Sequence, residues 1–435
     1  MILVNLPRPV TAALLFLTVP IAAGAQGSGT PPALEVKLDR AGWKYETGDT
    51  ARFTVSLTKA GQLPKGAKVE ITSGHVRLTP MSRETVDASS LPRTIKASMA
   101  EPGFIRVTAT VQNGSSVDTA LATAAFSPEK IGTATTMPGD FEKFWTETIT
   151  KARRTPLAPL LTKMPERSTP EVDVYHISFQ NDRVGSRIYG MLAIPSKPGR
   201  YPAVLSVPGA GVRPYFPDIG LARRGVIRLS IGIHGIPVDR DSLLYNELRA
   251  TALQRYNTYG MESRDTYYYK RVFAGVVRAG DFIYSLPQFD GQNYLVQGSS
   301  QGGGLAIVAG ALDERVKGIV VAYPAMSDHL SYLEGRTGGW PHHFVDTAGM
   351  RAIPEKVETL RYYDVVNFAR LLRVPGFYSW GYNDNVVPPS SSYAAFNLIT
   401  APKEVLIVPE TEHFKSPEQV AREREWILGK LGIAR

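Results

Sequence analysis

The order of apolar and polar residues divides the chain into two parts of different character. Between Ala33 and about Phe126, short runs of β-forming residues alternate with turns rich in glycine, proline, asparagine and aspartate. Strands at this spacing, without helical periodicity, are typical of a small β-sandwich, so we expect an immunoglobulin-like all-β domain over residues 33–130. The predicted strands are Leu34–Leu38, Ala51–Leu57, Lys68–Thr72, Thr94–Ser98 and Phe104–Val111.

The end of this domain is marked by a segment of small and hydroxyl-bearing residues, Gly132–Met137. Asp140 then precedes an amphipathic run and can cap a helix. The part before the boundary holds no nucleophile and base pair, and its only histidine, His75, is predicted to be a surface residue. We therefore expect the β domain to be non-catalytic and the chemistry to lie in residues 138–435.

Beyond the boundary, strand-like and helix-like segments alternate, which is typical of βαβ units around a mostly parallel, doubly wound sheet. The first two strands flank an Asn-Asp turn and read as a hairpin. Two helices are predicted, one over Tyr267–Leu286 and one directly after Ser300. The predicted strands are Val172–Phe179, Arg187–Ile194, Ala203–Val207, Val226–Ile231, Tyr294–Gln297, Val316–Ala322, Gly376–Trp380 and Glu404–Val408.

The amino terminus reads as a secretory signal. Arg8 is followed by an apolar stretch from Thr11 to Ala23 and by the small-x-small site Ala23-Gly24-Ala25. The stretch is shorter than the ~20 apolar residues that span a bilayer. We expect a signal peptide over residues 1–25, a linker over 26–32, no membrane span, and a mature protein that is periplasmic or secreted.

Composition narrows the chemistry. The chain has 435 residues, 43% of them hydrophobic and 20% charged, which is typical of globular proteins. Its net charge of +9 would be compatible with nucleic-acid binding. However, lysines and arginines are scattered and no nucleic-acid-binding motif is present, so no nucleic-acid partner is expected. The chain has no cysteine, which excludes disulfides and thiolate metal sites and leaves serine or threonine for covalent catalysis.

Ser300 is the candidate nucleophile. It lies in Gly298-Ser299-Ser300-Gln301-Gly302, which matches G-x-S-x-G between an apolar strand and a helix of small residues. The pattern needs that context, because the serine sits on a strained strand-to-helix turn where glycines let neighbouring backbone pass. The backbone N–H of Gln301 then points at the developing oxyanion. A purely structural turn is the alternative.

Three consecutive glycines, Gly302–Gly304, stand at the start of this helix. Each costs ~1 kcal/mol relative to alanine, so we expect another part of the chain to approach closely there. A phosphate-binding loop is the rival interpretation. No Gly-Lys-Ser/Thr follows, so the loop lacks the lysine and hydroxyl that such a site requires.

His413 is the candidate general base, because it is the only histidine late in the chain and follows the predicted strand Glu404–Val408. His342 and His343 are adjacent and are predicted to be surface or lid residues. A metal site made by these two and Asp346 is an alternative without a spaced ligand set. Three other histidines are less suited to be the general base because of their places in the chain: His176, His234 and His329.

The acid and the second oxyanion donor follow from their loops. Asp384 lies on the loop after the predicted strand Gly376–Trp380, where the acid belongs, although an ordinary turn can also use such a residue. The runners-up are Asp328 and Asp364. The loop after the strand Ala203–Val207 offers the N–H of Ala210, with Gly209 as the alternative.

From about Pro138 to the end, the chain resembles the acetyl xylan esterases and cephalosporin C deacetylases of carbohydrate esterase family seven, in the α/β-hydrolase superfamily. The resemblance implies an acetylated oligo- or polysaccharide substrate, deacetylation through an acyl-enzyme, and no metal or cofactor. The segments that carry it are Pro138–Trp145, Tyr267–Arg271 with Arg278 and Ala279, and Ser300–Gly304.

The chain also departs from this family. Ala210 and Ala325 stand where the family has tyrosine and phenylalanine, which predicts a roomier pocket unless Trp340 or Tyr215 refills it. Residues 338–341 read as an insertion or lid. The hexamers of compact members are not carried over, because the added domain can block those surfaces, and the oligomeric state stays open. Other classes weighed are a prolyl-oligopeptidase-like exopeptidase and a non-catalytic carbohydrate-binding protein.

Overall fold

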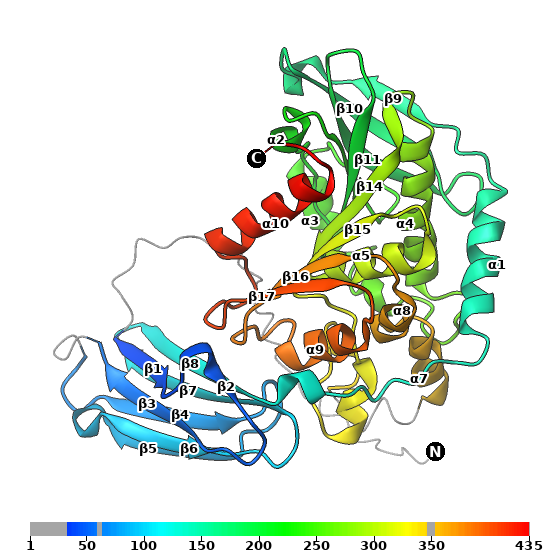
Figure 1. The fold of residues 1–435 in the computed structure, drawn as a ribbon. Coiled ribbons are helices and arrows are strands. Elements are labelled where there is room, and N and C mark those ends of the chain that lie inside the picture. The colour runs from blue at the N-terminus through cyan, green and yellow to red at the C-terminus, as the bar shows by residue number, and fades with distance from the viewer. Residues whose placement is uncertain (1–32, 59–62, 346–352, 435) are drawn as a thin grey trace, which may run out of the picture.

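The computed structural model describes residues 33–58, 63–345 and 353–434. A nine-stranded sheet in the order β17-β16-β15-β14-β12-β13-β11-β10-β9 runs through the larger part of the molecule (Figure 1). Its strands are β9 (Leu160–Lys163), β10 (Val172–Gln180), β11 (Arg187–Pro195), β12 (Tyr201–Val207), β13 (Ile227–Gly232), β14 (Phe289–Ser299), β15 (Gly318–Ala322), β16 (Gly376–Trp380) and β17 (Lys403–Ile407).

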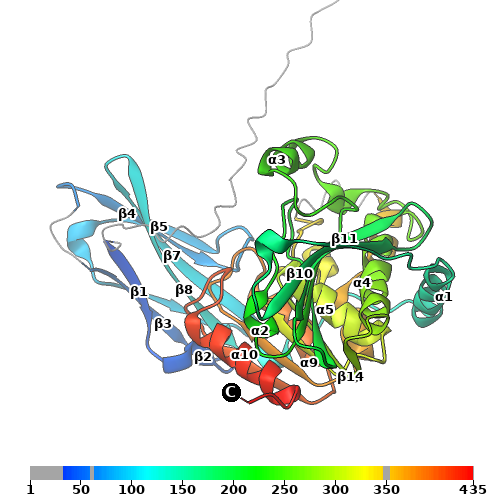
Figure 2. The ribbon, with the colours of Figure 1, turned by 90° about the horizontal axis from the view of Figure 1, so that it is seen from above.

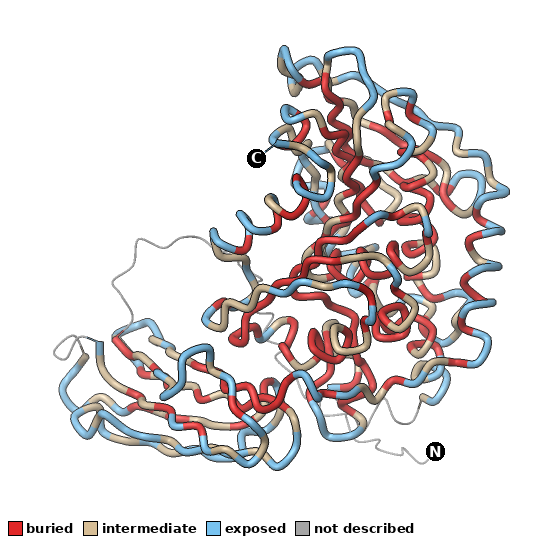
Figure 3. Tube along the Cα trace, in the orientation of Figure 1, coloured by how far each residue is buried: buried red, intermediate tan, exposed pale blue. Residues whose placement is uncertain are grey.

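The sheet is mostly parallel. The strands from β17 to β13 pair in parallel, and β11, β10 and β9 continue the sheet antiparallel. Every residue of β15 and β16 is buried, and the central strands form a buried layer in Figure 3. Strands covered on both faces read as continuous apolar runs, which is why the sequence predicts them. The predicted mixed α/β architecture and the β10–β11 hairpin are confirmed.

Helices cover both faces of this sheet. Figure 2 shows α2 and α10 on one side and α1, α4 and α5 on the other. Trp426 and Ile427 of α10 pack with Val320 and Phe377 of the sheet, whereas α5 packs in the larger core cluster. The helices are α1 (Phe141–Arg153), α2 (Ile219–Ala222), α3 (Ser242–Ala250), α4 (Tyr268–Tyr284), α5 (Gln301–Leu312), α7 (Pro354–Arg361), α8 (Val365–Leu371), α9 (Pro389–Leu398) and α10 (Pro417–Lys430).

The amino-terminal residues form two smaller sheets with the orders β1-β3-β6 and β2-β8-β7-β4-β5. Phe53, Val107 and Phe126 belong to a core cluster that both sheets share. The immunoglobulin-like assignment and the domain limits stay predictions. The strands are β1 (Leu34–Leu38), β2 (Lys44–Tyr45), β3 (Ala51–Leu57), β4 (Lys68–Gly74), β5 (Ser82–Asp87), β6 (Arg93–Ala97), β7 (Gly103–Asn113) and β8 (Ser116–Phe126).

The amino-terminal sheets contact the larger part where β16 leads into α9 (Figure 1). The ring of Phe104, on β7, lies 5.3 Å from that of Tyr382 and 5.9 Å from that of Tyr393, between ring centroids. Asn397 Nδ2 donates to the carbonyl oxygens of Pro128 and Ile131, each at 3.0 Å. The carboxyl ends of the parallel strands therefore face these sheets.

Two of the predictions concern residues outside the described part of the chain. The signal peptide and linker over residues 1–32 lie there, as does Asp346 of the alternative metal site. Within the described ranges, no helix has the length and apolar character needed to cross a membrane.

Candidate active site

The three predicted triad residues come from loops that follow three parallel strands. Ser300 follows β14, Asp384 follows β16, and His413 lies on the loop after β17. Because parallel strands end at the same edge of a sheet, these loops meet. His413 Nε2 lies 3.0 Å from Ser300 Oγ, and His413 Nδ1 lies 2.7 Å from Asp384 Oδ2. A hydroxyl, an imidazole and a carboxylate are thus joined at hydrogen-bond distances, in the order that the predicted roles require.

The backbone at Ser300 is strained, as the strand-to-helix turn requires. Its φ of 60° and ψ of −128° lie outside the regions that non-glycine residues ordinarily adopt. A Cβ at Gly298 would lie 2.1 Å from the carbonyl oxygen of Gly302, and a Cβ at Gly302 would lie 2.4 Å from that of Val207. Only glycine fits at these two positions, so the turn can close tightly enough to present the serine.

The close approach expected at the glycine run is also present. A Cβ at Gly303 would lie 2.8 Å from the carbonyl oxygen of Ala322, and a Cβ at Gly304 would lie 2.5 Å from that of Ala325. The approaching group is therefore backbone of the neighbouring strand end. The three glycines let α5 start directly against the sheet.

Gln301 is fixed by its side chain as well as by the helix. Its Oε1 accepts from the hydroxyls of Tyr256, at 2.8 Å, and Tyr269, at 2.7 Å, and its Nε2 donates to the carbonyl of Pro208 at 3.2 Å. Burial raises the pKa of Tyr256 to about 12, which keeps its hydroxyl protonated and donating. The start of α5 and the loop that carries Ala210 are thereby joined through one side chain.

Asp384 is fully buried, and two backbone groups orient its carboxylate. Val386 N and Val387 N each donate to Asp384 Oδ1 at 2.8 Å, which leaves Oδ2 for His413. The His413 ring lies 4.6 Å from the ring of Tyr323, between centroids, and its side chain is 24% exposed. The histidine is therefore held between a buried carboxylate and an aromatic ring, and it remains accessible from solvent.

A cavity of about 410 Å³ opens over Ser300 and His413. Gly209, Ala210 and Trp340 contribute to its wall, so the predicted oxyanion loop faces the reacting atoms. Ala325 is fully buried and is not among the lining residues, which contradicts a pocket widened at that position. Its place behind the turn follows from the hydrogen bond that its N–H donates to the Ser300 carbonyl at 3.0 Å.

The other histidines do not reach Ser300. His342 is half-buried, and its Nε2 lies 2.9 Å from the Val386 carbonyl while its Nδ1 lies 2.8 Å from the Tyr332 hydroxyl, so the surface or lid role of the pair stays a prediction. Burial lowers the pKa of His342 to about 3 and that of the neighbouring His343 well below its ordinary value. Both rings are therefore neutral, and both side chains are half-buried.

The alternative acids are also accounted for. Asp328 accepts hydrogen bonds from Thr133 Oγ1 at 2.6 Å and from Ala134 N at 2.8 Å. Asp364 accepts from the backbone N–H groups of Asp328 and His329 at 2.7 and 2.8 Å. Both carboxylates accept hydrogen bonds from backbone N–H groups, and neither contacts His413. Within the described residues, no group of three histidine or carboxylate side chains has the arrangement of a metal site.

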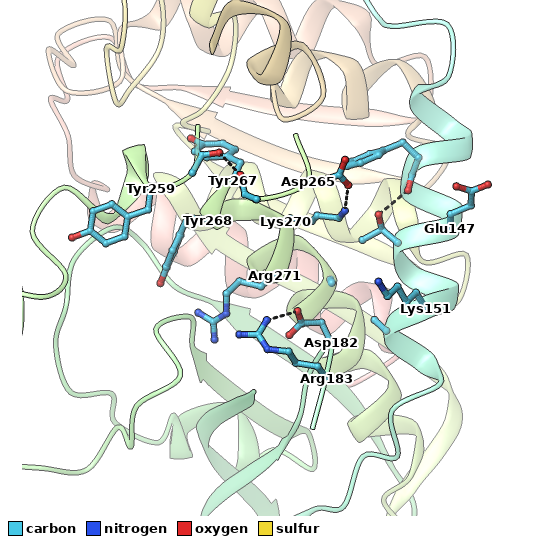
Figure 4. A pocket seen from close by; sticks show the side chains of 16 residues that line it. Glu147, Lys151, Asp182, Arg183, Tyr259, Asp265, Tyr267, Tyr268, Lys270 and Arg271 are labelled. Carbon is cyan, nitrogen blue, oxygen red and sulfur yellow. Dashed lines mark hydrogen bonds and ion pairs between the residues drawn. The ribbon is translucent and has the colours of Figure 1, made fainter. Parts of the chain in front are cut away.

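A larger cavity, of about 660 Å³, lies between α1 and α4 (Figure 4). Its charged side chains partly pair with one another, as in the Lys270–Asp265 ion pair of 2.5 Å and the Arg183–Asp182 pair of 3.3 Å. None of the triad residues lines it. The smaller cavity is therefore the candidate active site.

Comparison with known proteins agrees with this geometry. Residues 129–428 match the sequence profile of the acetyl xylan esterase family (AXE1). The chain belongs to this family. It is also 39% identical, over 396 residues, to acetyl esterase Axe7A of Xylanibacter ruminicola, and the match covers 89% of this chain and 88% of that protein. The family resemblance predicted from the sequence is thus confirmed.

Solved acetyl xylan esterases share the fold. The enzyme from Paenibacillus sp. R4 superposes with a TM-score of 0.60 at 24% identity, covering 69% of this chain and 98% of that one. Acetyl xylan esterase 1 from Thermoanaerobacterium sp. gives the same TM-score at 20% identity, with 70% and 97% covered. At these identities the likeness concerns the architecture.

Sequence reasoning missed several residues that support the site in this family member. Tyr256 and Tyr269 hold Gln301, and the tyrosine run around Tyr269 is a signal that could have indicated them. Arg106 and Thr123 of the amino-terminal sheets contact the loop that carries Asp384. No local pattern distinguishes these two from ordinary strand residues, because their partners lie far away in the sequence.

Proposed function

We propose that this chain is a serine esterase that removes acetyl or similar short acyl groups from acetylated carbohydrates, such as xylan or its oligosaccharides, through an acyl-enzyme. The observation that carries the proposal is the continuous arrangement of Ser300, His413 and Asp384 at the mouth of a cavity. Membership of the acetyl xylan esterase family and the 39% identical acetyl esterase support the substrate class.

In the first step, His413 Nε2 takes the Ser300 hydroxyl proton as Oγ attacks the ester carbonyl carbon. The carbonyl oxygen becomes an oxyanion, and the N–H groups of Gln301 and Ala210 are proposed to bind it. Asp384 holds the Nδ1–H of His413 and stabilises the imidazolium. As the carbonyl re-forms, the bond to the sugar oxygen breaks, and His413 gives its proton to that oxygen.

In the second step, water replaces the sugar hydroxyl. His413 takes a proton from the water as its oxygen attacks the acyl-serine carbonyl, and the same two N–H groups stabilise the new oxyanion. Collapse releases the carboxylic acid and returns the proton to Ser300 Oγ. Every proton transfer in this scheme uses one imidazole nitrogen, which the 3.0 Å distance to Ser300 permits.

We further propose that the protein is exported. The proposal rests on the basic residue, apolar stretch and small-x-small site of residues 1–25. Cleavage after Ala25 predicts a mature chain that begins at Gln26. Sequencing the amino terminus of protein recovered outside the cytoplasm tests this proposal.

The catalytic proposal is tested with Ser300→Ala on a nitrophenyl acetate. We expect activity to fall by several orders of magnitude, on the order of 10⁶-fold for a nucleophile, with the fold intact because one hydroxyl is removed. Ser285→Ala is the matched control, since it removes a hydroxyl that donates to the Phe282 carbonyl at the end of α4 and does not line the cavity over Ser300. A Ser300→Ala protein with a tenth of the normal rate would disprove the assignment.

The substrate class is tested separately. Acetate release from acetylated xylan and its oligosaccharides is compared with hydrolysis of an amino-acyl anilide. Turnover of the acetylated glycans, without cleavage of the anilide, is the expected result. Anilide cleavage alone would instead indicate an exopeptidase with the same triad.

A further inference from the structure

The loop that carries Asp384 is held by a residue of the amino-terminal sheets. Arg106, on β7, donates from one nitrogen, Nη2, to the carbonyl oxygens of Tyr382 and Asp384, each at 3.1 Å. Its Nε donates to Thr123 Oγ1 at 2.8 Å, which fixes the guanidinium against β8. One side chain therefore bonds the backbone of the Asp384 loop at two carbonyl groups. This side chain lies 278 residues before Asp384 in the chain.

A second contact runs through the same two strands. Thr123 is fully buried, and its hydroxyl donates to Asn383 Oδ1 at 3.0 Å. Asn383 Nδ2 in turn donates to the carbonyl of Glu410 at 3.3 Å, on the loop that leads to His413. The amino-terminal sheets are thus hydrogen-bonded to the acid loop and, through Asn383, to the histidine loop.

These contacts matter for Asp384 because its carboxylate is oriented by its own loop. The donors to Asp384 Oδ1 are the N–H groups of Val386 and Val387, so the direction of the carboxylate follows the backbone of residues 382–387. A change in that backbone would move Oδ2 relative to His413 Nδ1. Misplacement of a catalytic group by about 1 Å can cost about 10²-fold in rate.

Arg106 also brings positive charge to this place. Burial lowers its pKa to about 10, against the attraction of the Asp384 and Glu412 carboxylates, so it remains a cation at neutral pH. Hydrogen bonds from a charged donor are about twice as strong as neutral ones. A cation beside a buried carboxylate also offsets part of the cost of burying that charge.

We propose that Arg106 is a positioning residue for the catalytic triad, and that the amino-terminal sheets contribute to catalysis by holding the loop of Asp384. This inference rests on the proposed function, since it requires Asp384 to act on His413. It gives a positioning role to a β part that the sequence predicts to be non-catalytic. Arg106 acts through Asp384 and is not among the residues that line the cavity.

The test is a double-mutant cycle. Arg106→Met is made in the wild-type background and in Asp384→Asn, and kcat and KM are measured on a nitrophenyl acetate together with the melting temperature. In the wild-type background we expect kcat to fall about 10- to 100-fold and KM to change less than about twofold. In the Asp384→Asn background the same substitution should cost less than about threefold, because the residue through which Arg106 acts is already disabled.

A purely structural role gives a different outcome. Equal losses of kcat in both backgrounds, or an unchanged kcat in folded Arg106→Met, would overturn the proposal. Arg93→Met is the matched control, because it removes an arginine that pairs with Glu84 on the exposed side of the amino-terminal sheets, and it should leave kcat unchanged. An active Ser300→Ala enzyme would contradict the proposed function. An inactive Ser300→Ala enzyme, together with equal effects of Arg106→Met in both backgrounds, would contradict only the role of Arg106.

A second variant serves if Arg106→Met does not fold. Thr123→Val keeps the shape of the side chain and removes the hydroxyl that bonds Asn383. We expect kcat to fall about three- to tenfold in the wild-type background and to be nearly unchanged in Asp384→Asn. A Thr123→Val enzyme with full kcat would contradict the proposed support of this loop.

Discussion

Two buried carboxylates, Asp384 and Asp364, lie in similar surroundings and serve different purposes. Both are fully buried and both accept backbone N–H groups. Asp384 uses one oxygen for backbone and offers the other to His413. Asp364 uses both, since Oδ1 accepts from Asp328 N and Oδ2 from His329 N and Thr135 Oγ1.

The difference shows what suits Asp384 to its proposed role as triad acid and Asp364 to a structural role. Burial raises the pKa of Asp364 to about 6, although four hydrogen bonds oppose the shift. Its donors are a hydroxyl and backbone amide groups, none of which gains or loses a proton near neutral pH. A carboxylate with one oxygen facing an imidazole can orient that ring and stabilise its imidazolium form, whereas one whose two oxygens both accept from the surrounding chain can only hold the chain in place.

The largest expected effect that tests the comparison of Asp384 with Asp364 is a loss of kcat. Asp384→Asn should lower kcat by up to about 10⁴-fold, because the amide no longer fixes the histidine tautomer. Asp364→Asn should change kcat less than about threefold but lower the free energy of unfolding by about 1–3 kcal/mol, since the amide NH₂ meets other donors. Kinetics on a nitrophenyl acetate and urea unfolding measure both quantities.

The other runner-up acid, Asp328, provides the control for that experiment. Asp328 is also buried and bonds Thr133 and Ala134, so Asp328→Asn should behave like Asp364→Asn. If either of these variants loses more kcat than Asp384→Asn, the acid has been assigned to the wrong loop.

The next effect is on stability as a function of pH. Burial lowers the pKa of His329, beside Asp364, to about 4 from its ordinary value of 6.5. Between these values the unfolded chain binds a proton on this ring and the folded chain does not. The free energy of unfolding therefore falls as pH falls through this window, by about 1 kcal/mol per pH unit from this residue.

His329→Gln removes the titrating ring and should flatten that dependence by the same amount. Urea unfolding of both proteins at pH 7, 6 and 5 gives the two slopes. Equal slopes would mean that His329 is protonated in the folded protein as readily as in the unfolded chain.

The smallest effect concerns the cavity that Asp384 and His413 serve. Ala210 lines it, so Ala210→Tyr should reduce the rate on butyrate and hexanoate esters relative to acetate by about 1–3 kcal/mol in transition-state free energy. Ala325 does not line the cavity, and Ala325→Phe should lower stability by overpacking without changing acyl preference. A wild-type enzyme that already rejects butyrate, and whose profile Ala210→Tyr leaves unchanged, would show that another residue closes the pocket.

Much of the larger part could be predicted because its signals are local. The buried parallel strands are apolar along their whole length, as in β15 and β16, and the turn at Ser300 carries glycines that no other residue can replace. Chain order then selected Asp384 and His413 from the remaining carboxylates and histidines. The catalytic roles of these residues stay predictions that the geometry supports.

The features that were not predicted depend on contacts between residues far apart in the sequence. Strand β8 was not among the predicted strands because its four alanines give a weak strand signal. His342 bonds the Val386 carbonyl and the Tyr332 hydroxyl, two partners that its place next to His343 in the sequence does not indicate. Arg106 reaches Asp384 across 278 positions, and a polar residue at an alternating strand position gives no indication of such a partner.

The glycine run behind Ser300 has a consequence for engineering. Gly302, Gly303 and Gly304 each face a backbone carbonyl oxygen closer than any side chain tolerates, so combinatorial libraries that vary them would consist almost entirely of inactive clones. Ala210 and Trp340 border the same reaction centre from loops and can vary in size without disturbing the turn. A search for new ester specificities in this scaffold should therefore randomise the cavity wall and leave the start of α5 unchanged.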